Sequence, residues 1–329
     1  MRTLILVLTL AALRNISTAQ TFAIVETSTF VPENKKIALL KNAAGKKLIF
    51  FKTNLAVNTD GIPISYHPYD LRGDSIALNS ILNAVSVYRL RDGVNLSVPR
   101  PKGRYSKAER SKMATEAYSA IEAWRESGYQ PLSIKGYRIV WKNVLVPVDN
   151  KPCVFAEGKY KGYFASTTAL TNGLTQDKGE CNCNNQVDPF EIPALVLAAN
   201  GISAKNPVRT FGATVGDLLL AYNPSNKALV YAIIGDTGPA DNLGEGSVIL
   251  NMKLNAINKF PSKKRDTYDL ATGNNIMICI IPGSNAFELV RPYTQANIQS
   301  RITDWFINQG FTTEAEIFQF FETNRLQFK

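Results

Sequence analysis

Short apolar runs separated by turn residues recur between residues 151 and 290 and are the strongest constraint on the fold. Only one helical pattern lies among them, just after residue 247. Strands of this length and spacing are typical of a closed barrel or a sandwich, not of alternating strand and helix units. We therefore predict a mainly β fold with added helices. The runs are GYFASTTAL, IPALVLAA, DLLLAY, ALVYAIIG and IMICIIPG.

Residues 99–150 break the strand pattern and predict a basic helical insertion. The stretch RPKGRYSKAERSK, residues 100 to 112, contains one acid, Glu109, among many Lys and Arg residues. A helix through about Ser127 follows, with apolar residues three or four positions apart on one face. This spacing indicates a helix docked on a core, with a solvated basic flank. The apolar face is formed by Met113, Ala117, Ile121 and Trp124.

The tail, residues 291–329, predicts a C-terminal helical hairpin packed on the domain formed by residues 20–290. Its first helix places apolar side chains on one face. Thr313 and Glu316 then form a capping-box pattern ahead of a second apolar series. The two series are Ile298, Ile302, Trp305 and Phe306, and then Ile317, Phe320 and Phe321.

Residues 1–19 have the features of a secretory signal peptide. A basic residue, the apolar run TLILVLTLAAL and the small-residue end STA are followed by Gln20. That apolar run is too short to cross a bilayer, and no later stretch approaches the roughly 20 apolar residues of a membrane helix. We expect a secreted protein, extracellular or periplasmic, without a membrane span.

The cysteines favour an oxidising compartment. Cys153 pairs most readily with Cys181 or Cys183, and sequence does not choose between them, while Cys279 lies in an apolar run as a buried thiol. His67 is the only histidine, and the Cys-x-Cys spacing is unusual for zinc, so we expect no metal and no cofactor. A single histidine also disfavours Ser-His-Asp and Cys-His catalysis. Carboxylates remain for proton transfer.

The stretch IIGDTGPADNLGEGS, residues 233 to 247, places two carboxylates in unlike surroundings. Asp236 follows a buried strand, which raises the pKa of a carboxyl. Glu245 precedes a helix that Ser247 caps, and a helix N-terminus favours the ionised form. An acid and base pair requires two carboxyl groups in unlike environments. A surface turn without a catalytic role explains the same residue types.

Several stretches together resemble glycoside hydrolase family 75, the inverting endo-chitosanases. The likeness covers roughly residues 48 to 95 and 160 to 285, and the Asp-x-Gly-Pro and Gly-Glu-x-Ser block is its most specific part. It implies a barrel related to the double-psi type, which we take as a closed six-stranded barrel. The stretches are FFKTNLAVNTDGIPISYHP, YFASTTAL, VDPFEIPALVL, GDLLLAYN and YAIIGDTGPADNLGEGSVIL.

The resemblance implies an essential aspartate and glutamate, which fall on Asp236 and Glu245. We predict Asp236 as general acid and Glu245 as general base of an inverting hydrolysis of chitosan. The family more often has an aspartate where Asn58 stands. Substrate-binding candidates are Asp60, Tyr66, His67, Asp188 and Glu191, each of which a turn or a structural contact explains about equally well.

Net charge limits the choice of partner. The chain carries a formal charge of +10, or about +8 once Arg2 and Arg14 leave with the signal. Chitosan is a polycation, so such a protein repels it at long range unless the cleft is locally acidic. A hydrolase of another amino-sugar polymer and a non-catalytic polysaccharide-binding or envelope-binding protein therefore stay open. No nucleic-acid-binding signature is present, and we expect a monomer.

Overall fold

The computed structural model describes residues 21–98, 103–173, 181–182, 185–202, 205–273, 275–286 and 291–325. The predicted signal peptide, the start of the basic stretch at 99–102, Cys183 and the last four residues lie outside these ranges.

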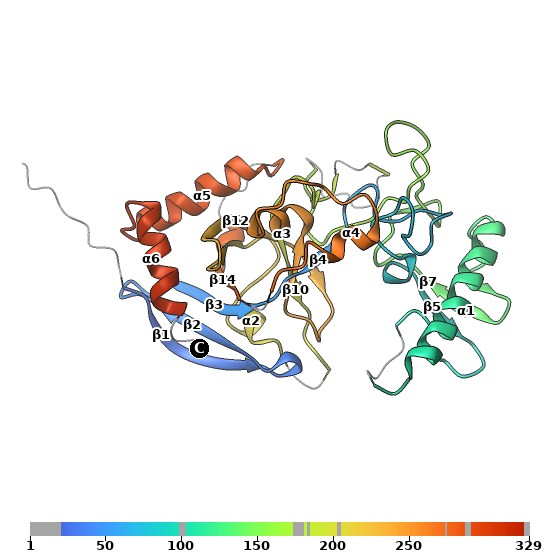
Figure 1. The fold of residues 1–329 in the computed structure, drawn as a ribbon, viewed down its shortest axis with the longest axis horizontal. Helices are drawn as coiled ribbons and strands as arrows, with labels where there is room; N and C mark the ends of the chain where they lie inside the picture. The colour runs from blue at the N-terminus through green and yellow to red at the C-terminus, as the bar shows by residue number, and fades with distance from the viewer. Residues whose placement is uncertain are drawn as a thin grey trace, which may run out of the picture.

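A large mixed sheet forms the centre of the molecule (Figure 1). Nine strands of the described ranges join it in the order β1-β2-β3-β14-β11-β12-β10-β13-β4. β10 runs parallel to β12 and β13 runs parallel to β4, whereas the other neighbours are antiparallel. In that order the strands are Ala23–Phe30, Lys35–Lys41, Lys47–Thr53, Ile276–Ile281, Leu218–Asn223, Ala228–Gly238, Ala194–Ala198, Glu245–Ser247 and Ala56–Asn58.

Both faces of β10, β11 and β14 are buried, which is why these strands are almost entirely apolar, whereas most of β1 is exposed. Alternate residues of one strand enter two different cores: Leu218 and Leu220 of β11 face one core, and Leu219 faces the other. The first core includes α5 (Gln295–Asn308) and α6 (Glu314–Arg325). The second includes side chains of α2 (Pro207–Thr210) and α3 (Val248–Leu254).

The expected closed six-stranded barrel of double-psi type is wrong. The fold is mixed α/β, with an open sheet whose outermost strands in the described residues, β1 and β4, do not pair. Closure depends on whether the first and last strands meet in register, and strand length and spacing do not contain that information. The hairpin of β1 and β2 adds to β3 and extends the sheet outward.

The C-terminal helical hairpin is confirmed, but it packs on a sheet face instead of a barrel. Thr313 Oγ1 accepts a hydrogen bond from Glu316 N, and Glu316 Oε2 accepts one from Thr313 N, which completes the predicted capping box. Phe320 and Phe321 are buried against Phe50 of β3. Figure 1 shows both helices beside β1, β2 and β3 at one end of the molecule.

The predicted basic helix is α1 (Lys107–Glu126), at the opposite end of the molecule (Figure 1). Ser106 caps it and forms a capping box with Glu109. The predicted apolar face is buried, together with Trp141, in a core of its own. This unit includes residues before 99, because β5 (Ser86–Arg89) pairs with β7 (Tyr137–Val140), which pairs with β6 (Ser133–Ile134).

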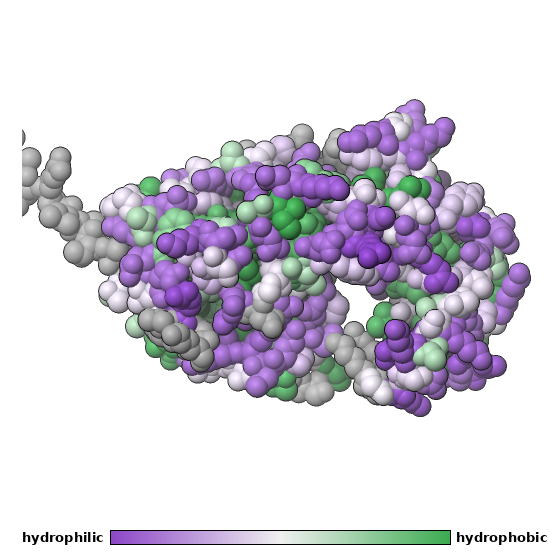
Figure 2. All heavy atoms as spheres, in the orientation of Figure 1, coloured by the Kyte–Doolittle hydropathy of each residue, from purple (hydrophilic) through white to green (hydrophobic). Residues whose placement is uncertain are grey.

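Short elements connect these parts. Cys153 and Cys181 form a disulfide, as expected, and Cys279 is a buried thiol in β14. Hydrophilic side chains cover most of the face seen in Figure 2. None of the helices in the described ranges is long and apolar enough to cross a membrane. The short elements are η1 (Val31–Glu33), η2 (Ile81–Asn83), β8 (Pro147–Val148), β9 (Lys151–Pro152), α4 (Lys264–Tyr268) and η4 (Ser284–Ala286).

Candidate active site

Asp236 and Glu245 lie on either side of β10. Val196 of β10 is paired with Asp236 of β12, and the register of β13 places the same residue beside Glu245. Side chains two residues apart on a strand lie on the same face. The side chain of Asp236 therefore lies on the face toward which a Cβ at position 238 would point. A Cβ added at Gly238 would lie 3.4 Å from Glu245 Oε2. The two carboxylates therefore share one face of the sheet, two strand spacings apart.

Asp236 is surrounded by hydrogen-bond donors. Its Oδ1 accepts from Ala169 N at 2.9 Å and from Thr237 N at 2.8 Å. Its Oδ2 accepts from Asn58 Nδ2 at 3.3 Å. Donors directed at both oxygens stabilise a carboxylate in its charged form and fix its orientation. Asn58, where the resembling family more often has an aspartate, thus acts here as a donor to Asp236.

Glu245 is in a different environment from the one expected. Burial is the main influence and raises the pKa of its carboxyl, and the charges of Asp236, Asp241 and Glu33 raise it further. A hydrogen bond from Asn242 Nδ2 to Oε1, 2.7 Å long, acts in the opposite direction. Burial thus acts against the charged form that the N-terminus of α3 is expected to favour. The carboxylate turns toward Asn242, while Ser247 caps the helix.

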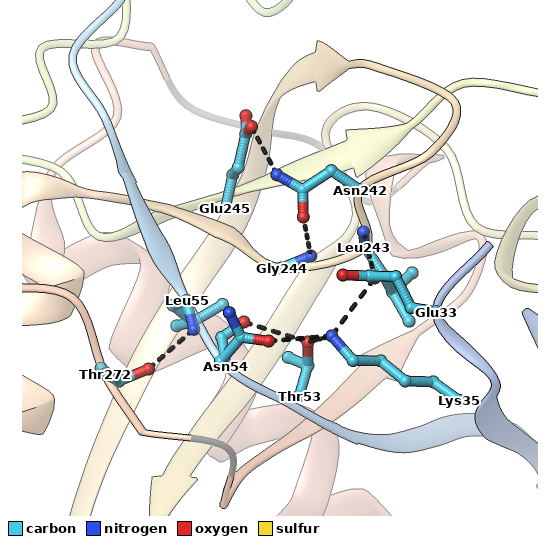
Figure 3. A network of polar contacts seen from close by, with 10 residues as sticks. All are labelled: Glu33, Lys35, Thr53, Asn54, Leu55, Asn242, Leu243, Gly244, Glu245 and Thr272. Carbon is cyan, nitrogen blue, oxygen red and sulfur yellow. Dashed lines mark hydrogen bonds and ion pairs between the residues drawn. The ribbon is translucent and has the colours of Figure 1, made fainter. Parts of the chain in front are cut away.

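The loop before Glu245 is fixed to the strands beneath it (Figure 3). Leu243 N donates to Glu33 Oε2 at 2.8 Å, and Glu33 is paired with Lys35 at 3.2 Å. Lys35 Nζ also donates to Thr53 Oγ1 at 2.7 Å, which ties the pair to β3. Figure 3 shows the Glu245 carboxylate pointing away from this cluster. The network holds the loop from below and leaves the carboxylate on the other side.

Close packing of the loop backbone explains why residue 244 is a glycine. A Cβ at this position would lie 1.8 Å from Asn54 O and 2.6 Å from Thr53 Oγ1. Gly244 O also accepts from Ala56 N at 2.9 Å, so the loop backbone lies directly against the start of β4. Only glycine permits this close approach of two backbone segments. Gly244 therefore serves the packing of the loop, whereas a glycine-rich loop by itself suggests room for a sugar chain.

Asp60, which is partly buried, is hydrogen-bonded to the buried Tyr66 beside Asp236. Tyr66 is fully buried, and its hydroxyl donates to Asp60 Oδ1 at 2.5 Å. Asn79 Nδ2 donates to the same hydroxyl oxygen at 3.2 Å. Burial, reinforced by the charges of Asp236 and Glu245, raises the pKa of Asp60 to about 7, although the Tyr66 bond lowers it. Asp60 is thus protonated in mildly acidic solution.

A pocket of about 420 Å³ opens beside these residues. It brings Asp60 and Asp236 together, whereas Glu245 is not part of its lining. Thr167 and Thr168 border it, and so does the segment from Lys142 to Pro147 of the insertion. The apolar residues of this segment do not by themselves indicate that it lines a pocket, and no other sequence signal identified it. The lining residues are Asp60, Lys142, Asn143, Val144, Pro147, Thr167, Thr168, Ala169, Asp236 and Thr237.

The other predicted binding residues lie outside this lining. His67 packs edge-on against Tyr163, with ring centres 4.8 Å apart, and its Nδ1 accepts from Tyr69 N. Asp188 Oδ1 accepts from Phe190 N at 2.8 Å and shapes a turn, and burial raises its pKa to about 6. Glu191 is exposed on that turn. The structure gives His67 and Asp188 local structural contacts instead of a place in the pocket.

The donor set does not resemble a metal centre. Across the part of the chain that the structure describes, no group of three or more His, Cys, Asp or Glu side chains could hold a metal ion. Comparison with models of known protein families and with curated proteins finds no match to this chain. The chemistry of the site therefore has to be argued from its carboxylates.

Proposed function

We propose that the protein is a secreted, endo-acting glycoside hydrolase that cleaves β-1,4 linkages of chitosan with inversion. The observation that carries this proposal is the placement of Asp236 and Glu245 on one sheet face in unlike environments. Two strand spacings put their backbones about 10 Å apart in a flat sheet. Inverting hydrolysis needs roughly 6.5–9.5 Å between the carboxyl groups, with room for a water.

The electrostatics favour the reverse of the predicted acid and base roles. Burial raises the pKa of Glu245, which suits this carboxyl to donate a proton to the leaving glycosidic oxygen. Asp236, which accepts hydrogen bonds on both oxygens, is suited to remain charged and to activate the attacking water. In this scheme the proton passes from Glu245 to the leaving sugar, and Asp236 takes one from the water.

Carboxyl groups near the pocket can also explain how a basic protein would bind a cationic polymer. The charges of Asp236 and Glu245 raise the pKa of Asp60, and the charge of Asp236 also raises the pKa of Glu245. The charge of Asp236 attracts an amino-sugar ammonium at short range, and near neutral pH the ionised fraction of Asp60 adds to it, although the protein as a whole is basic. The Cys153–Cys181 disulfide suits an exported protein.

The test is a reducing-end assay on chitosan, with the anomer of the first product followed by NMR. Asp236→Asn and Glu245→Gln should each lower kcat by about 10²–10⁴-fold, the usual contribution of a general acid or base. Asp269→Asn and Glu157→Gln change exposed carboxyls elsewhere and should leave kcat unchanged. The proposal fails if both site variants retain full activity, or if the first product keeps the β configuration.

A polysaccharide-binding protein without catalysis is the second candidate. It is favoured by one observation: Glu245 does not line the pocket that holds Asp60 and Asp236. Such a protein would sediment with insoluble chitosan and release no reducing ends. Parallel assays on partly acetylated chitin and peptidoglycan would show whether another amino-sugar polymer is the substrate.

A further inference from the structure

A second hollow lies next to the pocket that contains Asp60 and Asp236. Its volume is about 460 Å³, and it is formed by residues 129–132 together with Lys142 and Asn150. Lys142 lines both hollows, and its Nζ donates to Asn150 Oδ1 at 3.1 Å. The Lys142 side chain therefore forms the divide between them. A polymer lying over the carboxylates can continue past Lys142 onto the basic unit.

The two hollows differ in charge. The first contains the carboxyl groups of Asp60 and Asp236 beside Lys142, whereas Lys142 is the charged residue among those that form the second. Tyr129 stays a neutral phenol because burial raises its pKa to about 12. A glucosamine ammonium placed there would meet the Lys142 ammonium without a compensating carboxylate, and like charges at such range repel. The second hollow is thus unsuited to a cationic sugar.

The uncharged groups of the second hollow suit an acetylated sugar. Leu132 is 43% exposed, and Pro131 beside it is exposed as well, so both can contact an acetyl methyl group. Gln130 and Asn150 contribute side-chain amides that can bond an acetamido group or ring hydroxyls. The Tyr129 ring packs edge-on against Trp124 and Phe164, which fixes this wall in place. Ligand sites commonly combine apolar surface with a few polar groups in this way.

We propose that this second hollow is a distal subsite for a neutral N-acetylated unit of the polymer, and that Lys142 excludes a free amino sugar from it. The inference rests on the proposed function for the identity of the polymer. It assigns a role to residues 129–150, which lie far from Asp236 in the sequence. The expected substrate is accordingly partly acetylated chitosan, with free amines near the carboxylates and an acetylated unit beyond Lys142.

The experiment measures binding, so that it does not depend on hydrolysis. The full chain carrying Glu245→Gln is titrated calorimetrically with hexa-N-acetylglucosamine and with hexaglucosamine at pH 5.5. In this background, Lys142→Glu should raise the affinity for hexaglucosamine about tenfold relative to the acetylated hexamer. Leu132→Asp should weaken the acetylated hexamer about tenfold. Lys151→Glu makes the same charge change at an exposed lysine outside both hollows and should alter neither affinity more than twofold.

Failure of this inference is distinguishable from failure of the proposed function. If Lys142→Glu and Lys151→Glu act alike, if Leu132→Asp binds the acetylated hexamer as before, or if neither hexamer binds, the distal subsite is wrong. Active hydrolysis by the wild-type chain would then still support the glycosidase. If the Lys142→Glu preference shift and the Leu132→Asp weakening both occur but the wild-type chain releases no reducing ends, the subsite stands and the hydrolase proposal fails.

Discussion

Asn58 Nδ2 lies 3.3 Å from Asp236 Oδ2, although two strands, β10 and β13, separate β4 from β12 in the sheet. Three strand spacings correspond to about 14 Å in a flat sheet. The sheet must therefore curl sharply at this end, which brings its last strand over the candidate site. The same curvature brings the backbones of Asp236 and Glu245 closer together than the distance of about 10 Å that two strand spacings give in a flat sheet.

Replacing Asn58 tests this contact. Asn58→Asp turns a donor into a carboxylate beside Asp236, and a neighbouring like charge disfavours the ionised base. The acidic limb of the kcat profile should move to higher pH by about one unit, a shift of the size expected for a close charge. Asn58→Ala, which removes the donor without adding charge, should shift it less. Equal profiles for the two variants would contradict the role of Asn58.

Two neighbours of Glu245 should move its proton affinity in opposite directions. The hydrogen bond from Asn242 lowers the pKa of Glu245, so Asn242→Ala should shift the alkaline limb of the kcat profile to higher pH. The charge of Asp241 raises that pKa, so Asp241→Asn should shift the same limb to lower pH. Steady-state rates between pH 4 and 9 provide the measurement. Shifts of the same sign in both variants would argue against Glu245 as the general acid.

Gly244→Ala should disrupt the loop that carries Glu245. Its Cβ would overlap Asn54 O, a backbone atom that cannot move aside cheaply. We expect a loss of about 3 kcal/mol in the free energy of unfolding, as for other severe overpacking. Gly273→Ala is the matched control, because a Cβ there meets nothing within 4 Å. Urea denaturation of both variants measures the difference, and equal midpoints would show that the loop adjusts freely.

Asp60 makes stability depend on pH. Its pKa is raised to about 7 in the folded protein from an ordinary value of 3.8, so folding favours the protonated form. This contribution is complete below about pH 4 and is lost as the pH rises to about 7. One pKa unit corresponds to about 1.4 kcal/mol, and exposure at the pocket reduces the total to about 2 kcal/mol.

The control for this dependence is Asp60→Asn, which keeps an acceptor for Tyr66 and does not titrate. Urea unfolding of both proteins at pH 4, 5.5 and 7 isolates the contribution of Asp60 from that of other groups. The wild-type chain should lose stability relative to the variant as the pH rises. Parallel curves would mean that Asp60 keeps an ordinary pKa in the folded state.

Local sequence patterns predicted the helices and caps whose formation depends on residues close together in the sequence. The apolar face of α1, the Ser247 cap of α3 and the capping box of Thr313 and Glu316 all follow from residues within a few positions of each other. The same patterns could not decide whether the sheet closes, because β1 and β4 would have to meet through long-range pairing.

The candidate site was predictable only in part, for a similar reason. Asp236 and Glu245 stand nine residues apart in the sequence and can be singled out together. The pKa of Glu245 depends on burial by the whole fold, which outweighs the local helix N-terminus. The anchor from Glu33 to Leu243 joins residues 210 positions apart, and Lys142 enters from a different unit, so neither leaves a local signal.

The two C-terminal helices carry a consequence for biosynthesis. Ile302, Phe306 and Phe321 fill the same core as Ala38, Leu48 and Phe50, from strands near the start of the described chain. During translation those early strands emerge long before the helices that cover them, so one broad apolar face of the sheet stays open until almost the whole chain has left the ribosome. Until the two helices are synthesised, that apolar face is available to other apolar surfaces, which favours aggregation of the nascent chain.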